Sequence, residues 1–178
     1  MNAASLVLLG SLVWGCASHH PLPTLAQATG APAQHDAAAE TRRVQVALAT
    51  SLLEHGNADA ALSLIATVRL AGGRGVDLDV LEGRALRKAG LVDAAEALLA
   101  SVVRRHPGRG EAWNDLGILA MERRDFPTAV QRFEHAARVR PMRADFTDNL
   151  GFALLAAKRA PEAVVTLQRA LEQNAASP

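Results

Sequence analysis

Aromatic side chains are scarce in this chain of 178 residues, and tyrosine is missing altogether. Phenylalanine and tryptophan together make up 3% of the residues, whereas alanine and leucine dominate the apolar part of the composition. The strands of β-sandwiches and barrels are usually rich in aromatic and β-branched residues, while small and unbranched side chains favour closely packed helices. The composition therefore favours an all-α fold.

The chain also lacks a strong excess of either charge, and it has no second cysteine. The net charge of +1 gives no electrostatic basis for binding nucleic acid, so we expect no nucleic-acid partner. The single cysteine, Cys16, has no second cysteine in the chain with which to form a disulfide.

Motifs that carry catalytic or cofactor chemistry are also lacking. The sequence has no glycine-rich phosphate loop, no cysteine and histidine spacing typical of metal ligands, and no nucleophile elbow. Its only glycine cluster, Gly72 to Gly75, follows no expected strand. We therefore expect a protein that is not an enzyme and that uses no cofactor or metal ion.

The first apolar run, Leu6 to Trp14, is too short to span a bilayer but has the length of a signal-peptide core. It leads into Leu12-Val13-Trp14-Gly15-Cys16, which resembles the lipobox of bacterial lipoproteins. The resemblance implies a signal peptide at residues 1–15 and a lipid anchor, such as palmitate, on Cys16. It further implies attachment to the outer membrane, facing the periplasm. The alternative is a secretory signal cut after Ala17, which would release a soluble periplasmic protein.

Residues 16–38 are expected to form a flexible tether between this anchor and a folded domain at residues 39–178. The segment shows no apolar periodicity, and its composition cannot bury enough surface to offset the entropy lost on ordering. Pro21, Pro23, Gly30 and Pro32 are expected to interrupt any helix there.

Residues of fixed type recur every 34 positions, in the windows 42–75, 76–109, 110–143 and 144–177. The third window is the clearest, with seven residues at relative positions 4, 7, 8, 20, 24, 27 and 32: Trp113, Leu116, Gly117, Ala129, Phe133, Ala136 and Pro141. Small residues at positions 8, 20 and 27 let two antiparallel helices approach closely, and the apolar face that each pair leaves must be covered by its neighbours. We therefore expect four stacked helix-turn-helix pairs.

These seven residues occupy signature positions of the tetratricopeptide repeat (TPR) family, which the chain resembles over about three-quarters of its length. The resemblance implies a right-handed superhelical solenoid of about four repeats that binds other proteins. It also implies that the first helices line a concave groove, through positions 2, 5, 9 and 12 of each window. At positions 5, 9 and 12 stand Val46, Thr50, Leu53, Val80, Arg84, Arg87, Asn114, Ile118, Met121, Asp148, Phe152 and Leu155.

The chemistry of this predicted groove is mixed. Arg84 and Arg87 are expected to hold a carboxylate of the partner, and Asn114 a peptide backbone. Position 2 contributes Arg43, Asp77, Glu111 and Asp145.

The chain further resembles bacterial TPR lipoproteins of pilus and secretion assembly. This resemblance implies a membrane-anchored scaffold for protein partners in the cell envelope. An adaptor for peptidoglycan-modifying enzymes and a generic periplasmic scaffold are the alternatives. The last expected helix is apolar on two sides, through Val164, Val165, Leu167 and Leu171. We expect it to dock on a partner or on a second copy, which would give a homodimer.

Overall fold

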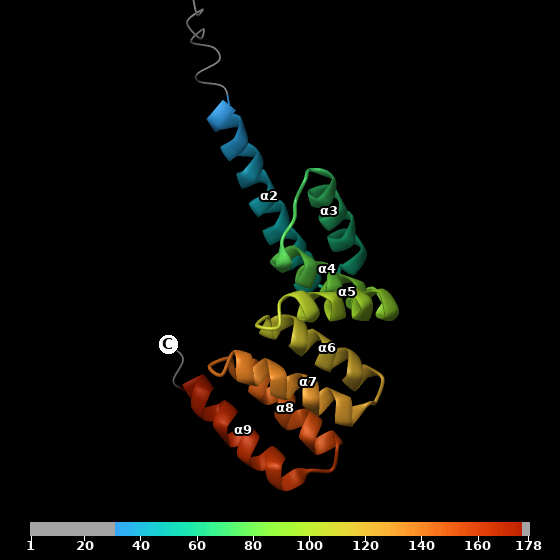
Figure 1. The fold of residues 1–178 in the computed structure, drawn as a ribbon, viewed down its shortest axis with the longest axis vertical. Helices are drawn as coiled ribbons and strands as arrows, with labels where there is room; N and C mark the ends of the chain where they lie inside the picture. Colours follow the sequence, from blue (N-terminus) through green and yellow to red (C-terminus); the bar gives the residue numbers. More distant parts are fainter. Residues whose placement is uncertain (1–30, 176–178) are drawn as a thin grey trace, which may run out of the picture. The chain divides into compact units, whose positions relative to one another are not determined.

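A computed structural model describes the backbone of residues 31–175 and the side chains of residues 37–175, and the regular elements of this part are all α-helices (Figure 1). They are α2 (Ala31–Glu54), α3 (Ala58–Leu70), α4 (Val76–Lys88), α5 (Val92–Arg105), α6 (Gly110–Glu122), α7 (Phe126–Val139), α8 (Ala144–Ala156) and α9 (Ala160–Ala175). The predicted all-α fold is confirmed. The expected signal peptide, Cys16 and the first part of the expected tether lie outside the described residues.

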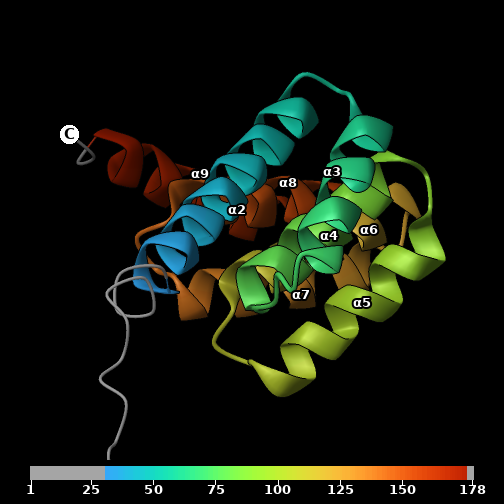
Figure 2. The ribbon, with the colours of Figure 1, turned by 90° about the horizontal axis from the view of Figure 1, so that it is seen from above.

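The helices repeat with the period of the sequence. The second helices begin at Ala58, Val92, Phe126 and Ala160, and so advance in steps of 34 residues. The first helices α4, α6 and α8 advance by the same step. From α4 on, each helix packs against the one before it, and α6 also contacts α4 and α8 (Figures 1 and 2). The array is therefore a stack of helical hairpins in which first helices of neighbouring repeats touch.

Each hairpin turns through a residue in the left-handed conformation at position 15 of its window. These residues are Gly56, Gly90, Arg124 and Lys158, with φ between 61° and 80°. The amide that follows each of them donates to a carbonyl of the first helix, as Asp125 N does to Ala120 O at 2.9 Å. This hydrogen bond is typical of helix C-termini at which a glycine adopts the left-handed conformation. In two of the repeats an arginine or a lysine takes the place of that glycine.

The two helices of a hairpin meet where position 8 faces position 24. A Cβ atom added to Gly83 would lie 2.6 Å from Leu99, and one added to Gly117 would lie 2.6 Å from the ring of Phe133. Gly151 faces Leu167 in the same way. The first repeat has Ala49 and Ile65 at these positions, both buried. Close approach of the paired helices therefore requires a small residue opposite a large one.

Helix α2 begins earlier than the sequence indicates. The expected tether extends to residue 38, but the backbone is helical from Ala31. The expectation that Pro32 interrupts a helix is wrong, because Pro32 lies in the first turn, where its missing N–H has no intrahelical partner to lose. The run that follows, Ala37 to Ala39, consists of alanine, which has the highest helix propensity of any residue type.

Replacing Gly117 by valine should destabilise the array by about 1–3 kcal/mol, because the new side chain collides with the buried Phe133 ring. Gly108→Val is the matched control, since Gly108 is exposed and a Cβ there meets no atom within 4 Å. The control should change stability by less than about 0.5 kcal/mol. Urea unfolding followed by circular dichroism measures both, and equal midpoints for Gly117→Val and wild type would contradict the packing described.

Candidate protein-binding groove

The first helices of neighbouring repeats line a hollow of about 230 Å³. It is lined by Val46, Thr50, Asp77, Val80, Leu81, Arg84, Arg109 and Glu111. Four of the predicted groove residues, Val46, Thr50, Val80 and Arg84, therefore lie together. A larger hollow of about 600 Å³ adjoins it, since Val46 and Asp77 line both.

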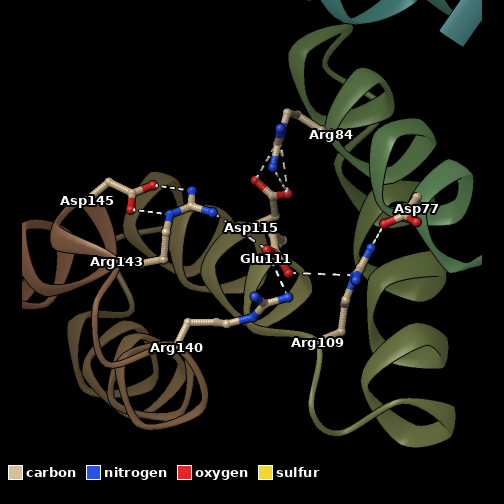
Figure 3. Close-up of polar contacts among 8 residues, drawn as sticks. All are labelled: Asp77, Arg84, Arg109, Glu111, Asp115, Arg140, Arg143 and Asp145. Carbon is tan, nitrogen blue, oxygen red and sulfur yellow. Dashed lines mark hydrogen bonds and ion pairs between the residues drawn. The ribbon is translucent and has the colours of Figure 1, made fainter. Parts of the chain in front are cut away.

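Alternating acids and arginines run along one side of the first helices (Figure 3). Arg109 contacts Asp77 and lies 3.6 Å, from Nε to Oε2, from Glu111. On the other side of Glu111, Nη1 of Arg143 lies 3.6 Å from Oε1, and Arg143 also forms a 2.7 Å ion pair with Asp145. We call these five residues the ion-pair ladder. It connects position 2 of three successive repeats through the arginine at position 34 of the second and third windows.

A partly buried ion pair connects the second repeat to the third. Both Nε and Nη2 of Arg84 donate to the carboxylate of Asp115, at 3.0 to 3.3 Å (Figure 3). The Asp115 side chain is 1% exposed, whereas that of Arg84 is 35% exposed. Burial raises the pKa of the Asp115 carboxyl above its ordinary value, although the Arg84 guanidinium opposes this rise.

Other polar side chains of the first helices also form hydrogen bonds with side chains of the neighbouring repeat. Nη1 of Arg87 lies 2.7 Å from Oε1 of Glu122, and Nδ2 of Asn149 donates to Oδ1 of Asn114 at 2.8 Å. Arg84, Arg87 and Asn114 are thus occupied within the chain, contrary to the expectation that they hold a partner's carboxylate or backbone. The carboxylates that the two arginines contact belong to the next repeat.

The tetratricopeptide repeat family model matches three overlapping segments, residues 46–110, 80–130 and 114–178. The chain belongs to the tetratricopeptide repeat family. TPR arrays bind other proteins through extended surfaces built from stacked repeats, and the protein-binding role expected from the sequence is shown at this general level.

Solved structures share the TPR fold of this chain. A thermophilic TPR protein of Thermus thermophilus, TTC0263, is 20% identical with a TM-score of 0.68, and the match covers 74% of each chain. MamA from Desulfovibrio magneticus RS-1, from residue 41 to its end, is 16% identical with a TM-score of 0.62, covering 76% of this chain and 77% of that one. At these identities the likeness shows the fold alone. Among curated proteins, none matches the chain.

The remaining predicted groove residues differ in their access to solvent. Leu53 is 2% exposed and packs in a core cluster with residues of α3 and α4, so it does not line the groove. Ile118 and Met121 are half-buried against the cluster around Phe133, and Asp148 is half-buried as well. Phe152 and Leu155 on α8 are 58% and 45% exposed. Of these six residues, Phe152 and Leu155 are the most exposed.

The ladder arginines and Asp115 were not predicted as site residues. A signal for the ladder exists in the sequence, because arginine stands at position 34 of two successive windows and an acid at position 2 of three. No such recurrence marks Asp115, since position 6 of the other windows holds Ala47, Leu81 and Asn149.

Residues 37–175 contain no group of three or more histidine, cysteine or acidic side chains placed to hold a metal ion. Within the part of the chain that the structure describes, no helix is long and apolar enough to cross a membrane.

The carboxyl pKa of Asp79, on α4, is shifted in the opposite direction to that of Asp115 on α6. Burial acts to raise the pKa of its carboxyl, but hydrogen bonds from Arg69 at 2.6 Å and Arg105 at 3.2 Å outweigh burial and lower the pKa below its ordinary value. The two aspartates should therefore affect stability in opposite directions as the pH changes.

Folded Asp115 binds its proton more tightly than the unfolded chain does, so its stabilising contribution is present below the ordinary carboxyl pKa of about 4 and is lost as the pH rises through the raised pKa. The contribution of Asp79 is present above the ordinary pKa and is lost as the pH falls through the lowered one. We therefore expect the difference in free energy of unfolding between wild type and Asp115→Asn, taken as wild type minus variant, to fall as the pH rises. The corresponding difference for Asp79→Asn should increase as the pH rises. Urea titrations across the acidic range measure both, and slopes of the same sign would refute this assignment.

Proposed function

We propose that this protein is a membrane-anchored scaffold that binds a protein partner along its first helices and assists assembly of a pilus or secretion complex in the cell envelope. Support for the binding role comes from the TPR family and from the geometry of the first helices. Most polar side chains of this face are paired within the chain, whereas Phe152 and Leu155 on α8 are exposed. We propose that the protein binds its partner and catalyses no reaction.

The observation that carries the proposal is the exposed apolar pair on α8. Phe152 and Leu155 lie three residues apart, so they stand on one face of the helix, and they are 58% and 45% exposed. Phe152 takes the position in the fourth repeat that Arg84 takes in the second. Adjacent exposed apolar side chains rimmed by polar groups are typical of protein-interaction sites.

The proposed anchor is a lipid on Cys16, which places the array at the outer membrane, facing the periplasm. Its support is the sequence Leu12 to Cys16 and the short apolar run before it. A signal cut after Ala17, with a soluble periplasmic product, is the competing outcome of the same experiment.

Pilus or secretion assembly is the proposed setting because a short TPR array, a lipid anchor and a connecting segment occur together in such assembly factors. An adaptor for peptidoglycan-modifying enzymes has the same parts and differs in its partner. The identity of the captured partner therefore separates these two roles.

A second copy of the chain is the other proposed occupant of an apolar face. On α9, Val164, Val165 and Leu171 are exposed, and Val164 and Leu171 lie two helical turns apart on one side. A homodimer through this helix would cover them.

In cells that express the tagged full-length chain, crosslinking should join it to a pilus or secretion component in the membrane fraction. Phe152→Asp with Leu155→Asp should reduce this product about tenfold or more, because two apolar contacts are lost. Val164→Asp with Leu171→Asp is the matched control, which should keep the partner and remove any crosslinked dimer. Cys16→Ala should move the chain to the soluble fraction.

Mass spectrometry of the crosslinked product identifies the partner. Cell-wall hydrolases or synthases would replace the pilus role by the peptidoglycan adaptor. Equal partner capture by wild type and by the Phe152 and Leu155 variant would remove this face as the binding site. Equal membrane association of wild type and Cys16→Ala would remove the lipid anchor.

A further inference from the structure

The ion-pair ladder stops at the boundary between the first and second repeats. Position 34 holds Arg109 and Arg143 in the next two windows but Gly75 in the first. Position 2 holds an acid in the last three windows but Arg43 in the first. The ladder therefore ends at Asp77, which Arg109 already contacts.

The larger hollow, of about 600 Å³, opens where the ladder stops. Gly75 lies in its lining, and a Cβ atom added there would meet nothing within 4 Å. The φ of Gly75 is +131°, a conformation that other residues rarely adopt, so the local backbone itself disfavours an arginine at this position. The space that Arg109 and Arg143 occupy in later repeats is thus left open in the first.

The lining of this hollow combines apolar and basic side chains. Ala39, Val46 and Ala47 provide the accessible apolar surface above the buried Val68 and Leu78. Positive charge comes from Arg42, Arg43 and Arg74. Arg43 forms an exposed 3.3 Å pair with Glu40. Arg42 and Arg74 have no ion pair within the described residues, and Asp77 is the one acid of the lining. Two positive charges beside an apolar surface therefore lack a counterpart.

We propose that this hollow binds an acidic segment of the protein partner in which carboxylate and apolar side chains alternate. The carboxylates lie between Arg42 and Arg74, where they take the place that the chain's own acids take beside Arg109 and Arg143. The apolar side chains cover Ala39, Val46 and Ala47. This proposal rests on the proposed scaffold function and adds the chemistry of its partner and a second contact site, separate from Phe152 and Leu155.

Fluorescence anisotropy with the purified full-length chain tests the site with a short labelled peptide that alternates leucine and glutamate. Arg42→Glu with Arg74→Glu should weaken binding about tenfold, since two attractive charge contacts become repulsive. Arg104→Glu with Arg138→Glu, two exposed arginines of α5 and α7, is the matched control and should bind like wild type. Circular dichroism verifies that both double variants are folded. Added salt should weaken the wild-type interaction.

Peptides of matched design test each part of the recognition. A peptide of serine and glutamate should bind more weakly because it lacks apolar contacts, and one of leucine and lysine should not bind. Equal binding of the leucine and glutamate peptide to wild type and to the Arg42 and Arg74 variant would overturn the proposal. So would binding to phosphatidylglycerol vesicles that depends on Arg42 and Arg74 without binding of the peptide, which would assign the hollow to a membrane surface.

Failure of the acidic-segment proposal is distinguishable from failure of the scaffold proposal. If the peptide fails to bind while wild type still crosslinks to an envelope partner through Phe152 and Leu155, the acidic segment is rejected and the scaffold stands. If no envelope partner is crosslinked, the scaffold fails whatever the peptide does.

Discussion

The array depends on one contact that recurs in every repeat, between a residue without a bulky side chain at position 8 and a large apolar residue at position 24. Gly83, Gly117 and Gly151 leave no room for a Cβ atom against Leu99, Phe133 and Leu167. A glycine in the middle of a helix costs about 0.5–1 kcal/mol relative to alanine, and this cost is offset because the second helix packs directly on the backbone of the first. The first repeat has Ala49 at position 8 and the β-branched Ile65 at position 24, and both are buried.

Polar contacts between repeats build on that packing. Once hairpins stack with a fixed offset, first helices touch, and side chains one period apart come within reach of each other. Arg84 then reaches Asp115, Asn149 reaches Asn114, and the ion-pair ladder forms along the same helices. Exposed ion pairs contribute little stability individually, so the main effect of the ladder is on the charge of the surface. Where it is complete, acids and arginines neutralise each other. Where it is interrupted at Gly75, the nearby Arg42 and Arg74 have no ion pair within the described residues, and the proposed acidic segment supplies carboxylates for them.

The sequence was sufficient for the fold because the fold depends on residues whose type is restricted by space. A glycine at position 8 and an alanine at position 20 recur at a fixed period, so the repeat is visible in the sequence itself. The groove was less predictable. Arg84 and Arg87 were expected to hold a carboxylate of the partner, but within the chain they pair with Asp115 and Glu122. This pairing depends on how far one repeat is offset from the next. Leu53 has the register of a groove residue, yet α4 covers it in the core. Pro32 shows that position within a helix, and not residue type alone, decides whether proline interrupts it.

The most direct measurement of the central claim is a double-mutant cycle at Gly117 and Phe133. The two substitutions Gly117→Ala and Phe133→Ile together reproduce the pair Ala49 and Ile65 of the first repeat. Each substitution alone should destabilise the array, the first by collision with the ring and the second by leaving space beside the glycine. Together they should lose at least about 0.5 kcal/mol less than the sum of the two single losses. Strictly additive losses in urea unfolding would contradict the claim that this contact sets the packing of each hairpin.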